Sequence, residues 1–223
     1  SERIDNTGAV LQPLDDKQLA QLTKLISDNQ YQSIAVSFLF SFANPAHEQQ
    51  IAGALRSLGV VVSASHEVLP EFREYERTST TLINAYVSPI LEKYLANLEK
   101  HKPPHANLLI MQSNGGVISA RQARKYGVRC ILSGPAGGIS GALTVARSMD
   151  TQDTSAPAQI ITFDMGGTST DVALVIGEPS LTTETVIDGY PIGIPALDIH
   201  TIGAGGGSIA SLDKGGALRV GPE

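Results

Sequence analysis

Two apolar segments of this chain, at residues 160–163 and 172–175, are joined by a stretch rich in groups that can bind phosphate. Asp164 follows the first segment, Asp171 precedes the second, and two glycines and the run Thr168-Ser169-Thr170 lie between them. A Gly-Gly pair alone is typical of a type I′ hairpin turn, but that turn needs neither the hydroxyl groups nor both acids. Glycines let backbone N–H groups approach an anion closely, and a carboxylate can hold Mg²⁺ that bridges phosphate oxygens. The stretch therefore favours a phosphate-binding hairpin, with an ordinary turn as the alternative.

Within this hairpin we expect Asp164 to be catalytic, by holding Mg²⁺ or by ordering an attacking water. Asp171 is a second candidate metal ligand, or else a support for the loop. The candidates for phosphate contacts are Gly166, Gly167, Thr168, Ser169 and Thr170. Two other phosphate motifs are missing, because the chain has no GxxxxGK[ST] sequence and no helix is predicted directly after the glycines.

A second polar cluster lies in the segment DIHTIGAGGGS, which starts at Asp198. If this segment is a strand, Asp198 and His200 point to the same face. Such a pair suits a metal or a proton transfer, so both are candidate catalytic residues. The alternative is a surface histidine, or one whose hydrogen bonds are satisfied in the core. The glycines at 203–207 either approach phosphate or substrate or form a mobile loop.

Two further groups of small and polar residues are candidates for ligand contacts. Asn114 and Gly115 follow a predicted strand, and ligands gather at the carboxyl ends of strands in α/β sheets, so we expect a substrate contact there; the alternative is a simple turn. Gly134, Gly137 and Gly138 begin a helix of small residues and permit close packing near the cleft. Gly137 and Gly138 are also candidate cofactor contacts.

The composition excludes several classes of function. A net charge of −6 argues against a nucleic-acid-binding surface, which needs a basic stripe, and no run of 18 apolar residues suggests a membrane span. No signal peptide is visible, and the single cysteine, Cys130, cannot form an internal disulfide, so we expect a cytoplasmic protein with a buried structural thiol. His101 and His105 flank two prolines and do not form a zinc pair.

The predicted elements divide the chain into an α/β region at 1–105 and a second region at 106–223. Strands at 33–40 and 60–65 flank a helix at 44–59, which predicts a βαβ unit with a parallel strand pair, and another helix precedes it at 14–26. A long helical connector follows at 73–100. Its apolar residues, with Leu82, Tyr86, Ile90 and Tyr94 among them, repeat every four positions and are predicted to pack on the sheet. Its charged start, from Arg73 to Arg77, is predicted to be solvated, and Pro89 to kink or restart the helix.

The second region also alternates between strands and helices, so the whole chain is predicted to be α/β. Helices are predicted at 119–127, with Ser119 as the cap, and at 134–149. The predicted strands lie at 106–112, 128–132, 159–164, 171–176 and 179–187. The segment at 150–158 is predicted to be a flexible surface loop.

Five segments of this chain, in order, resemble the hydantoinase A / 5-oxoprolinase family. They are VLPEFREYERTSTTLINAYVSPIL, QSNGGVISA, SGPAGGISGA, FDMGGTSTDVALV and DIHTIGAGGGSIA, and the resemblance covers essentially the whole chain. The hairpin, preceded by a helix of small residues, is also similar to the second phosphate loop and the crossing helix of the actin-like ATPase superfamily. The resemblance therefore implies a partial actin-like ATPase (ribonuclease H-like) fold with an N-terminal βαβ region.

The resemblance further implies an ATP- and Mg²⁺-dependent hydrolase of cyclic amides, namely hydantoins, N-methylhydantoins or 5-oxoproline. The ring amide would be activated by phosphorylation of its oxygen, with a hydantoinase B-type partner subunit or domain. The alternatives are an acetone carboxylase-type subunit and a non-catalytic nucleotide-binding module. The family carries an earlier Asp-x-Gly-Gly-Thr loop that this sequence lacks, so we expect an internal fragment with half of a nucleotide site, weak ATP affinity and no turnover alone.

Overall fold

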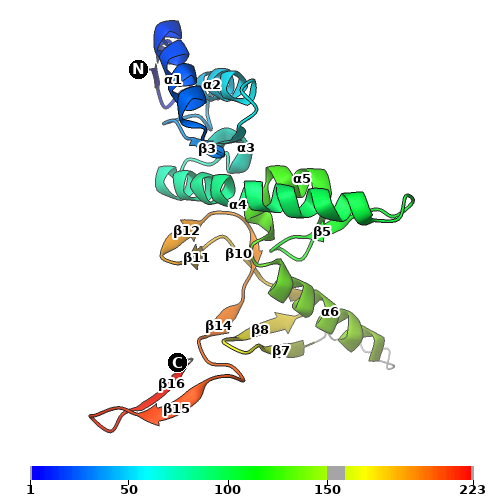
Figure 1. Cartoon of the computed structure of the whole chain (residues 1–223). Coiled ribbons are helices and arrows are strands. Elements are labelled where there is room, and N and C mark those ends of the chain that lie inside the picture. The colour runs from blue at the N-terminus through cyan, green and yellow to red at the C-terminus, as the bar shows by residue number, and fades with distance from the viewer. Residues whose placement is uncertain (1, 150–158, 222–223) are drawn as a thin grey trace. The chain divides into compact units, whose positions relative to one another are not determined.

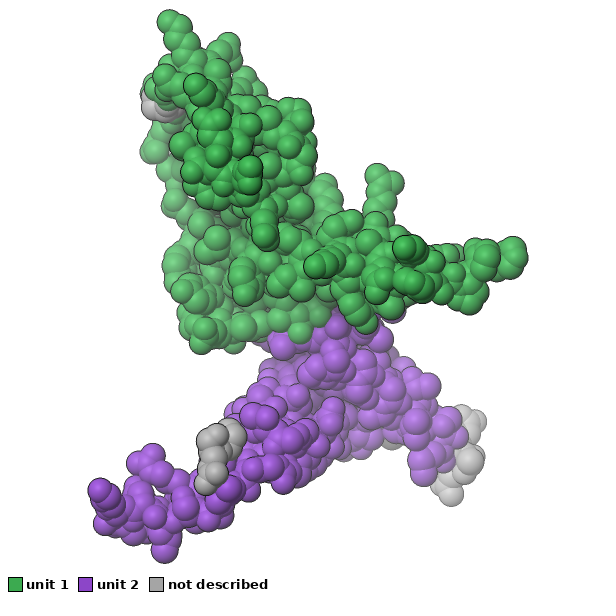
Figure 2. Space-filling model, in the orientation of Figure 1, with its two compact units in different colours: residues 1–110, 118–131, 183–194 green, residues 111–117, 132–182, 195–223 purple. Residues whose placement is uncertain are grey.

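The computed structural model describes residues 2–149 and 159–221 of the chain (Figure 1). These residues form two compact units, which Figure 2 shows in different colours. Unit 1 contains residues 1–110, 118–131 and 183–194, and unit 2 contains residues 111–117, 132–182 and 195–223. Each unit is therefore assembled from segments that are not consecutive, an arrangement that a single boundary near residue 105 does not describe.

Unit 1 contains the predicted βαβ motif. Strands β3 (Ser33–Val36) and β4 (Val61–Ala64) are parallel and are joined through helix α2 (Ala46–Arg56), which confirms the predicted pairing. Helix α1 (Asp16–Asn29) precedes them, and its cap is Asp15, whose carboxylate accepts a hydrogen bond from the backbone N–H of Lys17. The two helices and the strands enclose a core of Ile26, Val36, Ile51 and Leu55. The short strands β1 (Arg3–Ile4) and β2 (Val10–Gln12) form an antiparallel pair.

Helix α4 (Glu74–His101) packs on β3 and β4 as predicted and buries Leu95, but most of its buried side chains are polar and several of its apolar ones are exposed, which partly inverts the predicted pattern. Pro89 lies inside the helix, which continues past it. Its buried side chains include Thr80, Thr81, Asn84 and Ser88, whereas Leu82, Tyr86, Ile90 and Tyr94 are exposed. Asn84 explains the inversion, because its amide donates to Ser63 on β4 and to the Lys125 carbonyl oxygen, and its oxygen accepts from the N–H of Val128. The polar side of the helix is thus the side that its neighbours bind.

Arg77 corrects the prediction of a solvated helix start. Its side chain is fully buried, donates to the carbonyl oxygens of Glu71 and Phe38, and lies over the ring of Phe42. The N–H of Phe38 in turn donates to the buried carboxylate of Glu48 on α2. Arg77 and Glu48 are thus both buried, and their hydrogen bonds fix the backbone of Phe38 shortly after β3. Buried charged groups need such partners, and a charge pattern in the sequence does not reveal them.

The rest of unit 1 consists of short elements. Helix α3 (Ser65–Val68) precedes α4, and helix α5 (Ala120–Lys125) is capped by Ser119 as predicted. The predicted strand at 128–132 is wrong, because a 3₁₀ turn, η1 (Gly127–Cys130), stands there and leads into the next helix. Strands β11 (Thr185–Ile187) and β12 (Tyr190–Ile192) form a hairpin, whose Ile192 packs with Val68, Val128 and Ile194 in a second core. Strands β5 (Leu109–Met111) and β6 (Val117–Ser119) form a two-stranded sheet.

Unit 2 is built on an antiparallel sheet with the strand order β14-β8-β7. Its strands are β7 (Gln159–Met165), β8 (Thr170–Ile176) and β14 (His200–Ile202), with β9 (Glu178–Pro179) paired to the end of β8. Helix α6 (Ser133–Met149) covers one face, where Ala136, Ile139 and Leu143 pack with Ala173, Val175 and Leu197. This confirms the small-residue helix and the two strands that flank the Gly-Gly pair.

Short pairs complete unit 2. Strand β10 (Leu181–Thr182) pairs with β13 (Ala196–Leu197), and β15 (Ile209–Leu212) pairs with β16 (Leu218–Gly221). The single strand predicted at 179–187 is instead divided among β9, β10 and β11. The loop predicted at 150–158 lies outside the described residues. The fold is mixed α/β, and none of the described helices is long and apolar enough to cross a membrane.

Candidate functional site

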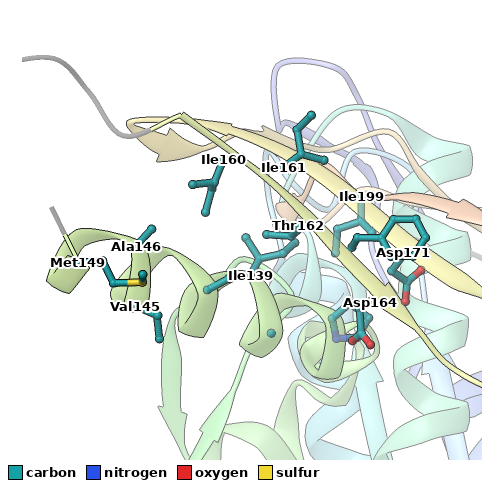
Figure 3. A pocket seen from close by; sticks show the side chains of 14 residues that line it. Ile139, Val145, Ala146, Met149, Ile160, Ile161, Thr162, Asp164, Asp171 and Ile199 are labelled. Carbon is teal, nitrogen blue, oxygen red and sulfur yellow. The ribbon is translucent and has the colours of Figure 1, made fainter.

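Asp164 and Asp171 are direct cross-strand partners at the end of the β7–β8 hairpin. They pair in the antiparallel register, and the N–H of Gly166 closes the hairpin by donating to the carbonyl oxygen of Ser169 at 2.9 Å. Residues directly opposite each other in a sheet point to the same face, so the two carboxylates lie side by side, as Figure 3 shows. We call these two residues the aspartate pair. Asp164 is exposed and Asp171 is half-buried.

The glycines of this hairpin are not explained by an ordinary turn. Gly166, Gly167 and Thr168 all lie outside the positive-φ region, so the type I′ turn that the alternative required is not formed. A Cβ atom added to Gly167 would meet no atom of the described chain within 4 Å, and one added to Gly166 would make an ordinary 3.5 Å contact with the Ser169 oxygen. Neither backbone conformation nor packing among the described residues therefore requires glycine here.

The tip of the hairpin presents donors that the described chain does not use. Within residues 2–149 and 159–221, the N–H groups of Gly167, Thr168 and Ser169 and the hydroxyl groups of Thr168 and Ser169 have no hydrogen-bond partner. Free backbone N–H groups that converge on one point, with hydroxyls beside them, form the kind of concave surface that binds phosphate oxygens. Three of the sequence-predicted contacts, Gly167, Thr168 and Ser169, thus carry free donors on one loop, whereas the Gly166 N–H is used to close the hairpin.

Thr170 differs from its neighbours. It is 2% exposed, and its hydroxyl donates to the carbonyl oxygen of Ala204 at 2.7 Å. This hydroxyl could bind phosphate only if its hydrogen bond to Ala204 were broken. In the structure Thr170 therefore connects the hairpin to the segment that contains Ala204.

The glycine loop, residues 203–207, lies directly against the hairpin. The N–H of Gly206 donates to the carbonyl oxygen of Gly166 at 2.9 Å, and that of Gly207 donates to the carbonyl oxygen of Gly167 at 2.7 Å. The loop follows β14, whose register places Thr201 opposite Asp171, and the Thr201 hydroxyl donates to the Asp171 carboxylate at 2.6 Å. Sequence reasoning missed both contacts. The only available signal was the glycine run itself.

Helix α6 approaches the aspartate pair through Gly138. A Cβ atom there would lie 3.7 Å from Oδ2 of Asp164, whereas one on Gly137 would face Met111 at 3.9 Å. Gly138 is therefore brought to the hairpin and Gly137 is not. A Cβ atom on Gly134 would meet nothing within 4 Å, so the close packing predicted for Gly134 is not seen.

A cavity of about 560 Å³ lies beside the aspartate pair, between α6 and β7 (Figure 3). Its walls are apolar and include Ile139, Val145, Ile160 and Ile199, and both acids of the pair lie in its lining. The volume falls in the range of small-molecule sites, which combine apolar walls with a few polar groups.

Asp198 and His200 are not brought to the aspartate pair. Asp198 lies between β13 and β14 rather than on a strand, and its N–H donates to the Ser180 carbonyl oxygen at 2.9 Å. His200 is paired with Val172, one position away from the Thr201–Asp171 pair, so its side chain points to the opposite face of the sheet. The prediction that Asp198 and His200 share one face of a strand is therefore wrong, because Asp198 is not on the strand, and a catalytic role for either residue stays a prediction.

Asn114 and Gly115 form a tight turn on the other side of α6. Gly115 has φ of 81°, and the Asn114 side-chain oxygen accepts the N–H of Gly116 at 2.9 Å. Both residues line a cavity of about 360 Å³ with Ser140, Thr144 and Arg147, and this cavity shares no residue with the one beside the aspartate pair. The turn explains the glycine, and the substrate contact remains a prediction.

The aspartate pair is the only part of the predicted metal site that the described residues supply. No group of three or more His, Cys, Asp or Glu side chains that could enclose a metal ion occurs among them. Mg²⁺ does not require such a cage, because it keeps several waters and is bound by one or two carboxylates together with substrate phosphates. Two adjacent carboxylates beside free N–H donors fit that mode.

Two family models match this chain. The hydantoinase/oxoprolinase model matches residues 77–223, and the model of the hydantoinase/oxoprolinase N-terminal region matches residues 1–59. Among curated relatives, the caprolactamase subunit alpha of Pseudomonas jessenii is 37% identical over 226 residues, which is 99% of this chain and 32% of that protein. The 5-oxoprolinase of Saccharomyces cerevisiae is 37% identical over 220 residues, which is 96% of this chain and 16% of that protein.

Two solved structures are similar along the whole chain. The ATP-dependent caprolactamase from Pseudomonas jessenii matches with a TM-score of 0.83 and 36% identity, covering 100% of this chain and 32% of that one. The nucleotide-free acetone carboxylase matches with a TM-score of 0.77 and 27% identity, again over 100% of this chain and 32% of that one. The chain thus spans about a third, or less, of the proteins that it matches.

Proposed function

This chain belongs to the hydantoinase/oxoprolinase family, and on that premise we propose that it carries a phosphate-binding loop of an ATP-dependent enzyme that opens cyclic amides. The observation that carries the proposal is the hairpin at 164–171. Its glycines are needed neither for a turn nor for packing, and its donors have no partner in the described chain. A ligand that approaches the backbone closely accounts for both facts.

In this proposal, the N–H groups of Gly167, Thr168 and Ser169 and the two hydroxyls hold phosphate oxygens of ATP. Phosphoryl transfer depends mostly on positioning and on neutralising charge, which is what a fixed set of donors does. The aspartate pair would hold Mg²⁺, which supplies positive charge to the phosphates when bound. Asp164 is the better ligand of the two, because Asp171 already accepts a hydrogen bond from Thr201.

Phosphorylation by ATP would activate a ring amide that otherwise reacts too slowly with water. A bond forms between the amide oxygen and the γ-phosphorus of ATP while the bond to the leaving ADP oxygen breaks. Water then adds to the activated carbon, and the C–N bond of the tetrahedral species breaks with the nitrogen leaving as the protonated amine. A second water hydrolyses the resulting acyl phosphate to the carboxylate and inorganic phosphate. The chain's own residues would contribute by holding the phosphate oxygens and by keeping the reacting groups in line, which lowers the entropic part of the barrier.

The fold that we propose for the complete protein is of the actin-like ATPase type. Unit 2 would supply the second phosphate loop and the helix before it, α6, whose Gly138 faces Asp164. The other phosphate loop and the adenine-binding segment would come from parts of the protein outside this chain. One relative is named a subunit alpha, which supports a complex of several subunits, and the partner that we propose is of the hydantoinase B type.

A lactam or related cyclic amide is the substrate class that we propose, with a ketone-carboxylating enzyme as the rival. Identity favours the first: among the solved structures the caprolactamase is 36% identical and the acetone carboxylase 27%, and among the curated relatives the caprolactamase and 5-oxoprolinase are each 37% identical, against 33% for an acetophenone carboxylase gamma subunit. The apolar cavity beside the aspartate pair fits the ring carbons of a lactam.

The experiment measures phosphate release by the complete protein, with its partner subunit where it has one. The substrates are 5-oxoproline, hydantoin and caprolactam, tested against acetone with bicarbonate. Phosphate release that depends on a cyclic amide supports the proposal. Release that depends on the ketone supports the carboxylase, and nucleotide binding without any substrate-dependent release supports a non-catalytic module.

A further inference from the structure

We propose that the glycine loop, residues 203–207, is a positioning element that sets the shape of the phosphate-binding hairpin, and that it does not bind phosphate itself. The inference rests on the proposed function of the hairpin. The N–H groups of Gly206 and Gly207 donate to the carbonyl oxygens of Gly166 and Gly167, at 2.9 and 2.7 Å. The N–H of Gly205 donates to the Ser208 hydroxyl at 2.8 Å, and that of Ala204 donates to the Ile202 carbonyl oxygen at 2.8 Å. Four consecutive N–H groups that an anion could use are therefore already taken.

These contacts act on the side of the hairpin that does not face a ligand. Each peptide group has a carbonyl oxygen and an N–H group that point in opposite directions. When the glycine loop holds the carbonyl oxygens of Gly166 and Gly167, it orients the N–H groups of Gly167 and Thr168, which are the free donors. Thr170 adds a third connection through its bond to the Ala204 carbonyl oxygen. Backbone donors stabilise a developing charge only when they are held in place beforehand.

The approach of the two loops is close enough to require glycine at particular positions. A Cβ atom on Gly205 would lie 2.5 Å from the Gly166 carbonyl oxygen and 2.9 Å from the Gly167 carbonyl group, and one on Gly207 would lie 2.9 Å from the Gly167 carbonyl oxygen. A Cβ atom on Gly206 would make an ordinary 3.7 Å contact with the Gly166 oxygen, and one on Gly203 would meet nothing within 4 Å. None of these four glycines has a positive φ, so the contact distance of the added Cβ atom is the property in which they differ.

This difference gives a test with controls inside one loop. The variants Gly205→Ala, Gly207→Ala, Gly206→Ala and Gly203→Ala are made in the complete protein, and the measured quantities are KM for ATP, KM for the cyclic amide, kcat and the melting temperature. We expect Gly205→Ala and Gly207→Ala to raise KM for ATP or lower kcat by at least about tenfold, since displacements near 1 Å can cost that much. KM for the amide should stay within about twofold, as should every constant of Gly203→Ala and Gly206→Ala.

Each outcome of this experiment supports or refutes the positioning role of the glycine loop. If Gly205→Ala and Gly207→Ala have wild-type constants for ATP, the positioning role is wrong, although the hairpin can still bind phosphate. If all four variants behave alike, contact distance is not the cause and the inference fails. If Gly205→Ala does not fold, Gly207→Ala decides, because its clash is milder. A wild-type protein that binds no ATP refutes the proposed function instead, so the two failures are distinguishable.

Discussion

The hydroxyl of Thr201 donates a 2.6 Å hydrogen bond to Asp171, on the sheet face from which Asp164 also projects. The two acids of the aspartate pair therefore have different roles. Asp171 is held by its own sheet, while Asp164 has no hydrogen-bond partner among the described residues. A fixed acid next to a free one leaves Asp164 as the carboxylate that can move more freely to meet a metal ion or water.

Replacement of Asp164 should remove activity and leave the fold intact. The side chain is exposed, so Asp164→Asn loses a charge without breaking an internal contact of the described chain. We expect kcat to fall at least about a hundredfold, as when one charge-stabilising group is removed from an active site. The measurement is amide-dependent phosphate release, with circular dichroism as the check on folding. Turnover within a few-fold of wild type would show that Asp164 is not catalytic.

Gly167→Ala should weaken ATP binding without loss of stability. The added methyl group meets nothing within 4 Å in the described chain but projects from the loop that is proposed to hold phosphate. We expect the Kd for ATP to rise at least about tenfold, which corresponds to about 1.4 kcal/mol.

The matched control for Gly167→Ala is Gly141→Ala, in α6, where an added Cβ atom also meets nothing within 4 Å. It should leave the Kd unchanged and raise stability by up to about 1 kcal/mol, because alanine is favoured in helices. Calorimetry gives both quantities. Equal affinity of the two variants for ATP would contradict the close approach of phosphate to Gly167.

Loss of the Thr201 hydroxyl should affect catalysis more than stability. Thr201→Val keeps the shape of the side chain and removes the donor to Asp171. We expect kcat to fall at least about tenfold, in line with the worth of a hydrogen bond to a charged group, about 1.5–3 kcal/mol. Thr201→Ser retains the hydroxyl and should restore most of kcat. If the Thr201→Ser and Thr201→Val variants have the same kcat, the hydrogen bond to Asp171 does not contribute to catalysis.

In unit 1, Glu67 should stabilise the fold in a pH-dependent way. Burial raises the pKa of its carboxyl, but hydrogen bonds and charge from Arg56 and Lys125 outweigh that effect, so the pKa lies below its ordinary value. Arg56 donates two bonds, at 3.1 and 2.8 Å, and the Lys125 ammonium lies at 3.0 Å. A depressed pKa means that the stabilisation is present above the unfolded-state pKa, about 4.3, and is lost as the pH falls through the lower folded-state value.

The test compares the free energy of unfolding of wild type and Glu67→Gln between pH 7 and pH 3. At pH 7 the variant should be less stable by about 0.5–1 kcal/mol, a range suited to ion pairs with partly exposed partners. The difference should shrink as the pH falls below the unfolded-state pKa and through the lower folded-state value, where the wild-type carboxyl becomes protonated. A difference that is independent of pH would mean that packing, not charge, is responsible.

The parts of the structure that the sequence predicted are those with a local physical cause. The βαβ motif, the Ser119 cap and the strands beside the Gly-Gly pair follow from periodicity and capping, and all are confirmed. The aspartate pair was predicted as two candidates, and the sheet register makes them neighbours.

The failures share a different cause, since each depends on a partner far away in the sequence. Helix α4 was predicted to bury its apolar stripe, but Asn84 and Arg77 find buried hydrogen-bond partners that no periodicity encodes. His200 was grouped with Asp198 on the assumption of one continuous strand, and only the register with β8 places it on the other face. The contact of the glycine loop with the hairpin is equally invisible in sequence, because 40 positions separate the bonded residues Gly166 and Gly206 (206 − 166).

The interleaving of the two units constrains how the chain can reach its fold during synthesis. The second core of unit 1 joins Val68 and Val128 to Ile192 and Ile194, and the Gly193 N–H donates to the Thr80 hydroxyl at 2.9 Å. A ribosome releases the chain from its N-terminus, so this core stays open until residue 194 has emerged, by which time the β7–β8 hairpin of unit 2 is already outside. Unit 1 therefore cannot be completed until most of unit 2 has been released, and the order of translation places the emergence of the phosphate hairpin before the closure of a core in the other unit.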